Sequence, residues 1–250
     1  MATRAMATRS QTSGRDVVVP STQLPVRVTG MQSMASKMWI PFIGMGFMIV
    51  VAALIIGIVA STSAADWFSF AKVTREAAVT GSPLALEKAF VESTLAWLPA
   101  LKFLGIGMIL AGVTFLLATI LGALRTGGGR VQEALGASVH LIKIPMTAKM
   151  FPMVMMMGLM ILIAAVVVGI VDAAITFDYW NHSIANELDQ AVEGSALLST
   201  LSTINSIDMW VKPLKFVGMA SLLSGIGLAL ATIVQVLRWQ SSRLWDLLSS

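Results

Sequence analysis

The chain of 250 residues contains no cysteine and few charged residues, and each shortage excludes a class of chemistry. Without cysteine there are no disulfides, no thiolate metal ligands and no cysteine nucleophiles. Charged residues make up only 12% of the chain, about half of their usual share in a soluble domain. Hydrophobic residues make up 56%, and the mean hydropathy is +0.82. This composition predicts an integral membrane protein.

The charges leave four long uncharged stretches. The first lies between Lys37 and Asp66, and three more of 22 residues each lie between Lys102 and Arg125, Lys149 and Asp172, and Lys215 and Arg238. At 1.5 Å per residue, a helix of this length spans about 33 Å, which matches a hydrocarbon core of about 30 Å. We therefore predict four transmembrane helices, near residues 38–61, 101–124, 150–172 and 214–237.

The sequence also contains two copies of one pattern. Residues 37–59 and 149–171 are identical at 11 of 23 positions, and residues 97–125 and 210–238 at 13 of 29. We interpret this as a tandem duplication of a two-helix unit. The expected parts are a flexible tail (1–36), a first unit (37–136), a connection (137–148) and a second unit (149–250) that ends in an interfacial segment. An even number of helices per unit predicts a pseudo-twofold axis along the membrane normal.

Basic residues predict the orientation in the membrane. The tail with Lys37, the 125–149 segment and the segment from Arg238 onward carry eleven basic residues against three acidic ones. The other two connections hold most of the acidic residues. The positive-inside rule then places both termini and the middle connection in the cytoplasm, in a plasma or inner membrane. The tail is rich in Arg, Ser and Thr, so an organelle transit segment is the alternative.

Each outer connection is expected to form one or two short amphipathic helices on the outer surface. Ser82-Pro83 is a typical helix start, because a side-chain cap precedes proline at the first helical position, and we expect that helix to end near Trp97. Short interfacial helices are also predicted at 130–141 and 243–248. Aromatic residues near the outer boundary suggest an interfacial belt, with ligand stacking as the alternative. They are Trp67, Phe68, Phe70, Trp97, Tyr179, Trp180 and Trp210.

Small residues form stripes on the second helix of each unit. One stripe contains Gly107, Ala111, Thr114 and Ala118, and its counterpart contains Ala220, Ser224, Gly227 and Ala231. A second stripe contains Gly105, Gly112 and Thr119, repeated as Gly218, Gly225 and Thr232. Small residues let helix backbones approach closely in lipid. We therefore expect a packed bundle whose first stripes also contact other membrane subunits or a second copy of this chain.

Residue types that commonly act in catalysis or metal binding are few, with no cysteine and two histidines. We predict no catalytic, cofactor-binding or metal-binding residues and no nucleic-acid partner. Asp178 and His182 with Glu187 or Asp189 could form a surface metal site, but a solvated acidic loop is the simpler interpretation. Five methionines could bind Cu(I), but without a nearby histidine or cysteine we favour apolar packing. They are Met153, Met155, Met156, Met157 and Met160.

The function expected from these features is that of a non-catalytic integral membrane protein, an accessory, scaffolding or assembly subunit of a larger membrane complex. A transporter or channel for a small or uncharged solute is the alternative, and a metal-dependent membrane enzyme a third. Ion pairs are possible between Asp66 or Asp178 and Lys102 or Lys215 at the outer rim. Alternatively, both lysines extend to lipid headgroups.

Overall fold

The computed structural model describes residues 16–19, 30–136, 138–142, 145–182 and 185–249, and this part of the chain is almost entirely helical. The long helices are α1 (Gly30–Ser69), α3 (Pro83–Ala134), α4 (Met146–His182) and α6 (Ala196–Leu248). All four are long and apolar enough to cross a membrane. The prediction of a helical membrane protein with four candidate spans is therefore confirmed.

The long helices extend well beyond the predicted spans. They contain 37 to 53 residues, so they are about 55 to 80 Å long and must protrude from a hydrocarbon core of about 30 Å. The helix that starts after Ser82 does not end near Trp97, because α3 continues through Pro99 to Ala134. Residues 243–248 belong to α6 and do not form a separate interfacial helix.

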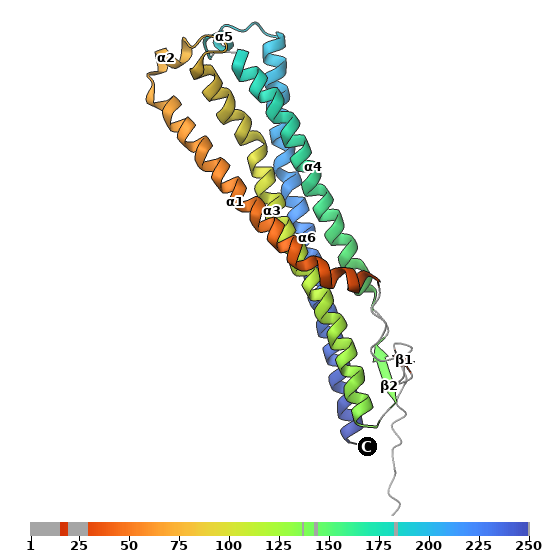
Figure 1. Cartoon of the computed structure of the whole chain (residues 1–250). Coiled ribbons are helices and arrows are strands. Elements are labelled where there is room, and N and C mark those ends of the chain that lie inside the picture. The colour runs from red at the N-terminus through yellow and green to blue at the C-terminus, as the bar shows by residue number, and fades with distance from the viewer. Residues whose placement is uncertain (1–15, 20–29, 137, 143–144, 183–184, 250) are drawn as a thin grey trace, which may run out of the picture.

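Two short helices lie in the outer connections, α2 (Lys72–Glu76) and α5 (Ala185–Asp189). Figure 1 shows both at one end of the molecule, which we call the outer end because the charge distribution predicts it to be extracytoplasmic. The opposite end, with the C-terminus, is called the inner end. Here α3 and α6 continue beyond α1 and α4 as a two-helix extension (Figure 1). The amide of Gln240 joins them by donating to the carbonyl of Leu124 at 2.8 Å.

A small antiparallel sheet lies near the inner end. Strand β1 (Asp16–Val19) pairs with β2 (Val139–Ile142), with Val18 opposite His140. Two expectations are therefore wrong. Residues 16–19 form a strand and not a flexible tail, and the helix expected over 130–141 is replaced by the end of α3 at Ala134 and by β2. Helix α1 also begins at Gly30, inside the expected tail. Residues 1–15 and 20–29 of that tail lie outside the described residues. The sheet places part of the N-terminal segment beside the middle connection.

The same type of close backbone contact occurs within each helix pair, α1 with α3 and α4 with α6. A Cβ atom added at Gly46 of α1 would lie 2.6 Å from the carbonyl oxygen of Gly105 in α3. A Cβ atom added at Gly158 of α4 would lie 2.8 Å from the carbonyl oxygen of Gly218 in α6. In the alignment of the two similar segments, Gly46 matches Gly158 and Gly105 matches Gly218. Backbone meets backbone at both crossings because no side chain separates them.

The described helices do not follow the expected twofold arrangement. Helix α3 packs against α1 on one side and against α4 and α6 on the other. A twofold axis would also place α6 against α1 as closely as α3 lies against α4, and these two helices do not pack in that way. Helix α1 is therefore at an edge with α3 as its main neighbour. The bundle is open, and α3 occupies its centre.

The turns before α3 and α6 have the same conformation. Gly81 and Gly194 have positive φ angles of 72° and 79°, as the third position of a type II turn requires. The next residue in each case, Ser82 or Ser195, accepts a hydrogen bond from a backbone amide of the first helical turn. The sequence signal for a helix start at Ser82 is confirmed.

Candidate functional site

The buried face of α4 follows a heptad pattern. Buried residues recur at alternating intervals of four and three along one seam: Phe151, Met155, Gly158, Leu162, Ala165, Gly169, Asp172, Thr176 and Tyr179. Helix α6 repeats the pattern with Val211, Lys215, Gly218, Leu222, Gly225, Ala229, Thr232 and Val236. This spacing is typical of knobs-into-holes packing between antiparallel helices. The seams hold the bundle together and determine which faces remain exposed.

The predicted stripes of α3 lie inside the bundle. Gly105 and Gly112 face α1, where Gly112 meets Trp39 and Ile43. Gly107 faces the opposite way, where an added Cβ atom would overlap Leu162 of α4 and lie 3.1 Å from Leu222 of α6. Ala111 and Thr114 of the same stripe are fully buried, and Ala118 is partly buried. Both faces of α3 are used within this chain.

The matching face of α6 is exposed. Its second stripe, with Gly218 and Gly225, packs against α4. The first stripe of small residues lies roughly a third of a turn away around the helix, and all four members are exposed: Ala220, Ser224, Gly227 and Ala231. A Cβ atom added at Gly227 would meet nothing within 4 Å. We call these four residues the α6 face.

Aromatic and basic side chains cluster at the outer end. The ammonium group of Lys88 in α3 lies 4.6 Å from the ring centroid of Trp67 in α1 and 4.0 Å from that of Trp180 in α4. The guanidinium of Arg75 in α2 lies 4.3 Å from the Trp67 centroid. These groups line a pocket of about 160 Å³. Trp67 and Trp180, predicted as belt residues, are thereby brought together around a cation, whereas Trp210, Phe68 and Phe70 are exposed.

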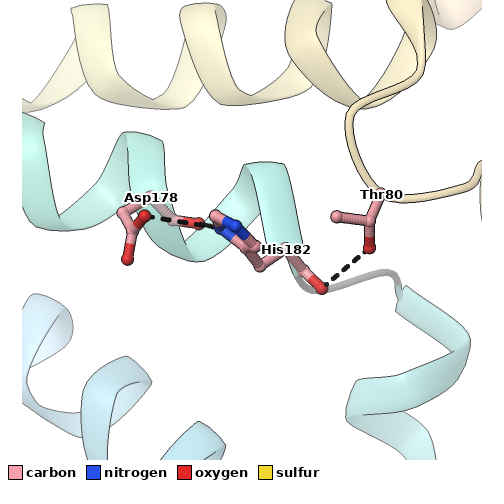
Figure 2. Close-up of polar contacts among 3 residues, drawn as sticks. All are labelled: Thr80, Asp178 and His182. Carbon is pink, nitrogen blue, oxygen red and sulfur yellow. Dashed lines mark hydrogen bonds and ion pairs between the residues drawn. The ribbon is translucent and has the colours of Figure 1, made fainter.

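Two hydrogen bonds tie the first outer connection to the end of α4. The hydroxyl of Thr80 donates to the carbonyl oxygen of His182 at 3.3 Å, as Figure 2 shows. The amide of Gly81 donates to the carbonyl oxygen of Asn181 at 3.3 Å. The segment before α3 is thus held against the end of α4, and the lysine and tryptophan residues of the pocket come from both halves of the chain.

Comparisons with family models, curated proteins and solved structures give no significant match. The function of this chain must be argued from its own geometry.

The proposed metal ligands are only partly brought together. The Nδ1 atom of His182 lies 2.8 Å from the backbone oxygen of Asp178 and 3.4 Å from a carboxylate oxygen of the same residue (Figure 2). Within the described ranges no group of three or more His, Asp or Glu side chains could hold a metal ion. Glu187 and Asp189, which lie in α5, therefore do not complete a site with this pair.

The methionines of α4 have two different environments. Met155 is buried in the seam against α6, as the packing interpretation requires. The other four point away from the bundle interior and are 48 to 73% exposed: Met153, Met156, Met157 and Met160. In a membrane this surface faces lipid or another chain, so internal packing explains only Met155.

Within the described residues, neither Asp66 nor Asp178 forms an ion pair with Lys102 or Lys215. In the described part of the chain, the ion pairs join residues four apart on one helix, as in Lys72–Glu76 at 3.3 Å and Lys88–Glu92 at 3.5 Å. Lys102 is exposed and its ammonium group lies near Gly57 of α1. Lys215 is buried in the α6 seam. The two lysines therefore have different environments although their local sequences match.

Proposed function

We propose that this protein is a non-catalytic integral membrane subunit that assembles with other membrane chains, or with itself, as an accessory or scaffolding component. The observation that carries the proposal is the exposure of the α6 face, since the matching residues of α3 are buried against α4 and α6. Lipid offers no hydrophobic driving force for helix association, so small residues stabilise a membrane protein chiefly where another helix packs on them. The α6 face is such a surface without a neighbour in the described chain.

The same proposal includes the tandem duplication, cytoplasmic termini and a plasma or inner membrane. The matching glycine crossings and the matching turns before α3 and α6 support the duplication. The location of β1, β2 and the end of α6 toward one end of the molecule supports termini on a common side (Figure 1). The basic residues at that end favour the cytoplasm.

Purification in a mild detergent from the native membrane tests the assembly. We expect the wild type to elute as a complex with a stoichiometric partner or as an oligomer. The double variant Ala220→Leu/Ala231→Leu should dissociate, because leucine side chains prevent close backbone approach, while its thermal unfolding stays unchanged. Ala164→Leu, an exposed alanine on α4, is the matched control and should leave the complex intact. A monomeric wild type, or a double variant that stays assembled, would contradict the proposal.

A transporter for a small uncharged solute is a second candidate, favoured by one set of buried polar atoms. Asp172, Thr176 and Tyr179 lie on the α4 seam and are at most 4% exposed. One side-chain oxygen of each has no hydrogen-bond partner within the described part of the chain. A polar solute could satisfy such groups as it passes. Proteoliposomes should then take up glycerol, and Thr176→Val should slow the uptake; equal rates with empty liposomes would rule this candidate out.

A further inference from the structure

The outer pocket is built from both halves of the chain. Its walls come from the end of α1, from α2, from the start of α3, from the end of α4 and from α5. Trp67, Lys88 and Trp180 line it next to one another, and Leu84, Ala85 and Ala185 add apolar lining. The volume of about 160 Å³ is close to that of a cavity of roughly 150 Å³ that accepts benzene. The pocket therefore suits a ligand with a small apolar body.

The charges around the pocket leave one cation without a counter-ion. Three basic side chains line it, Lys72, Arg75 and Lys88, together with a single acid, Glu76. Lys72 pairs with Glu76, and Lys88 pairs with Glu92. In the described residues the guanidinium of Arg75 has ring contacts with Trp67 and Phe68 but no ion pair, and its Nε atom is buried without a hydrogen-bond acceptor.

This arrangement indicates what kind of ligand the pocket accepts. A guanidinium stacked on an aromatic ring keeps its edge N–H donors available, and those donors match the two oxygens of a carboxylate. Lys88, which contacts two tryptophan rings, adds a second positive charge beside the Trp67 ring that Arg75 also contacts. We propose that the outer pocket binds a small organic carboxylate, with its oxygens toward Arg75 and its apolar body against Leu84 and Ala85.

Binding would hold the two halves of the chain together. Because the walls come from both halves, a ligand that binds only the folded state should raise the unfolding temperature of the whole protein. This effect does not depend on any partner at the α6 face. The pocket proposal and the assembly proposal can therefore fail independently.

Benzoate is the probe for the experiment, and benzamide is its uncharged counterpart of nearly the same shape. Benzoate should raise the unfolding temperature of the purified protein and change its tryptophan fluorescence in a saturable manner, and benzamide should do neither. Arg75→Gln should weaken benzoate binding at least tenfold. Arg130→Gln, which changes an exposed arginine at the inner end, should leave it unchanged. Fluorescence without ligand and unfolding temperature show whether each variant folds.

A lipid headgroup is the other possible source of an anion. Titrations in nanodiscs of phosphatidylglycerol and of phosphatidylcholine distinguish the two, since benzoate should bind equally well in both. Failure of benzoate to bind, equal effects of benzoate and benzamide, an unaffected Arg75→Gln variant or competition by phosphatidylglycerol would each overturn the proposal. Lys88→Met is a second variant that keeps much of the side-chain length, and it should also weaken binding without abolishing the fold.

Discussion

Single glycines set the distance between the helices of each pair. At Gly46 and Gly158 the nearest atoms of the neighbouring helix include backbone atoms, which cannot move aside as a flexible side chain can. Gly44 is only two residues from Gly46, yet an added Cβ atom there would meet nothing within 4 Å. The need for glycine therefore depends on the tertiary contact and not on the local sequence.

These neighbouring glycines provide a matched test. Gly46→Ala should lower the free energy of unfolding by about 1–3 kcal/mol, as overpacking typically does. Gly44→Ala should be neutral or slightly stabilising, because alanine favours helix over glycine. Thermal or denaturant unfolding in one detergent measures both. Similar effects at the two positions would mean that α1 and α3 do not cross at Gly46.

Gln132 is a buried polar residue that joins the inner end of α3 to β2. Its side-chain amide donates to the carbonyl oxygen of His140 at 3.0 Å and accepts from the amide of His140 at 2.8 Å. The side chain thus pairs with the strand backbone much as another strand would. With 1% of its surface exposed, it cannot readily exchange these bonds for water.

Replacing Gln132 should therefore loosen β2. Gln132→Met keeps the approximate size but leaves both backbone groups of His140 without these partners, at a cost of about 1–3 kcal/mol. Hydrogen exchange of the His140 amide should become faster while amides in the middle of α4 remain protected. Glu133→Gln, at an exposed neighbour, is the control. Unchanged exchange at His140 would show that the strand is held in another way.

At the scale of whole elements, α3 is the helix on which the others are arranged. It presents one small-residue face to α1 and another to α4 and α6. Helix α6 carries the same two stripes but buries only one of them. The difference arises because α6 lies at the side of the bundle, where no further helix of the described chain covers the α6 face.

A bulky residue on the buried stripe of α3 should therefore destabilise the fold. Gly107→Leu should destabilise the fold itself, because the new side chain would overlap Leu162 in the fully packed centre. Met108→Leu, a change of similar volume at a partly buried position, should cost less than about 1.5 kcal/mol. Unfolding in detergent measures both. Equal losses at Gly107 and Met108 would mean that the stripe does not form the contact.

For the whole molecule, the central question is the orientation of its two ends. Because the chain lacks cysteine, single cysteines can be introduced without background labelling. An impermeant maleimide added to intact cells should label Val79→Cys and Val192→Cys, both at exposed outer positions. It should label Glu133→Cys and Ser249→Cys only after permeabilisation. Different results for the two members of either pair would contradict four spans, and a complete reversal would contradict only the predicted orientation.

Much of the element content could be predicted from the sequence. A bilayer requires about 20 apolar residues per spanning helix, so the positions of lysine, arginine and aspartate alone indicate four spans. The serine caps before α3 and α6 are also local signals, because the capping oxygen and the amides that it accepts from are three residues apart. Such features depend on neighbours in sequence and therefore survive without a tertiary structure.

Helix length and buried faces were decided by the tertiary structure. The outer part of α3 contains Glu87, Lys88 and Glu92, which suggested a loop with a short helix, but packing against α1 and α4 keeps it continuous. In the spans nearly every face is apolar, so hydrophobicity does not reveal the seam. Residue size is the sequence feature that marks the seam, but it does not determine burial. The first stripe of small residues is buried on α3 and exposed on α6.

The outer pocket depends entirely on folding. Trp67, Lys88 and Trp180 belong to three helices and share no local motif, so the sequence suggested only an aromatic belt. The hydrogen bonds from Thr80 and Gly81 to the end of α4 bring these helices together. A cation between two aromatic rings is stable only at that short distance, because the attraction weakens beyond about 6 Å from the ring centroid. Composition determines that the chain enters a membrane, and the meeting of its helix ends determines where a ligand could bind.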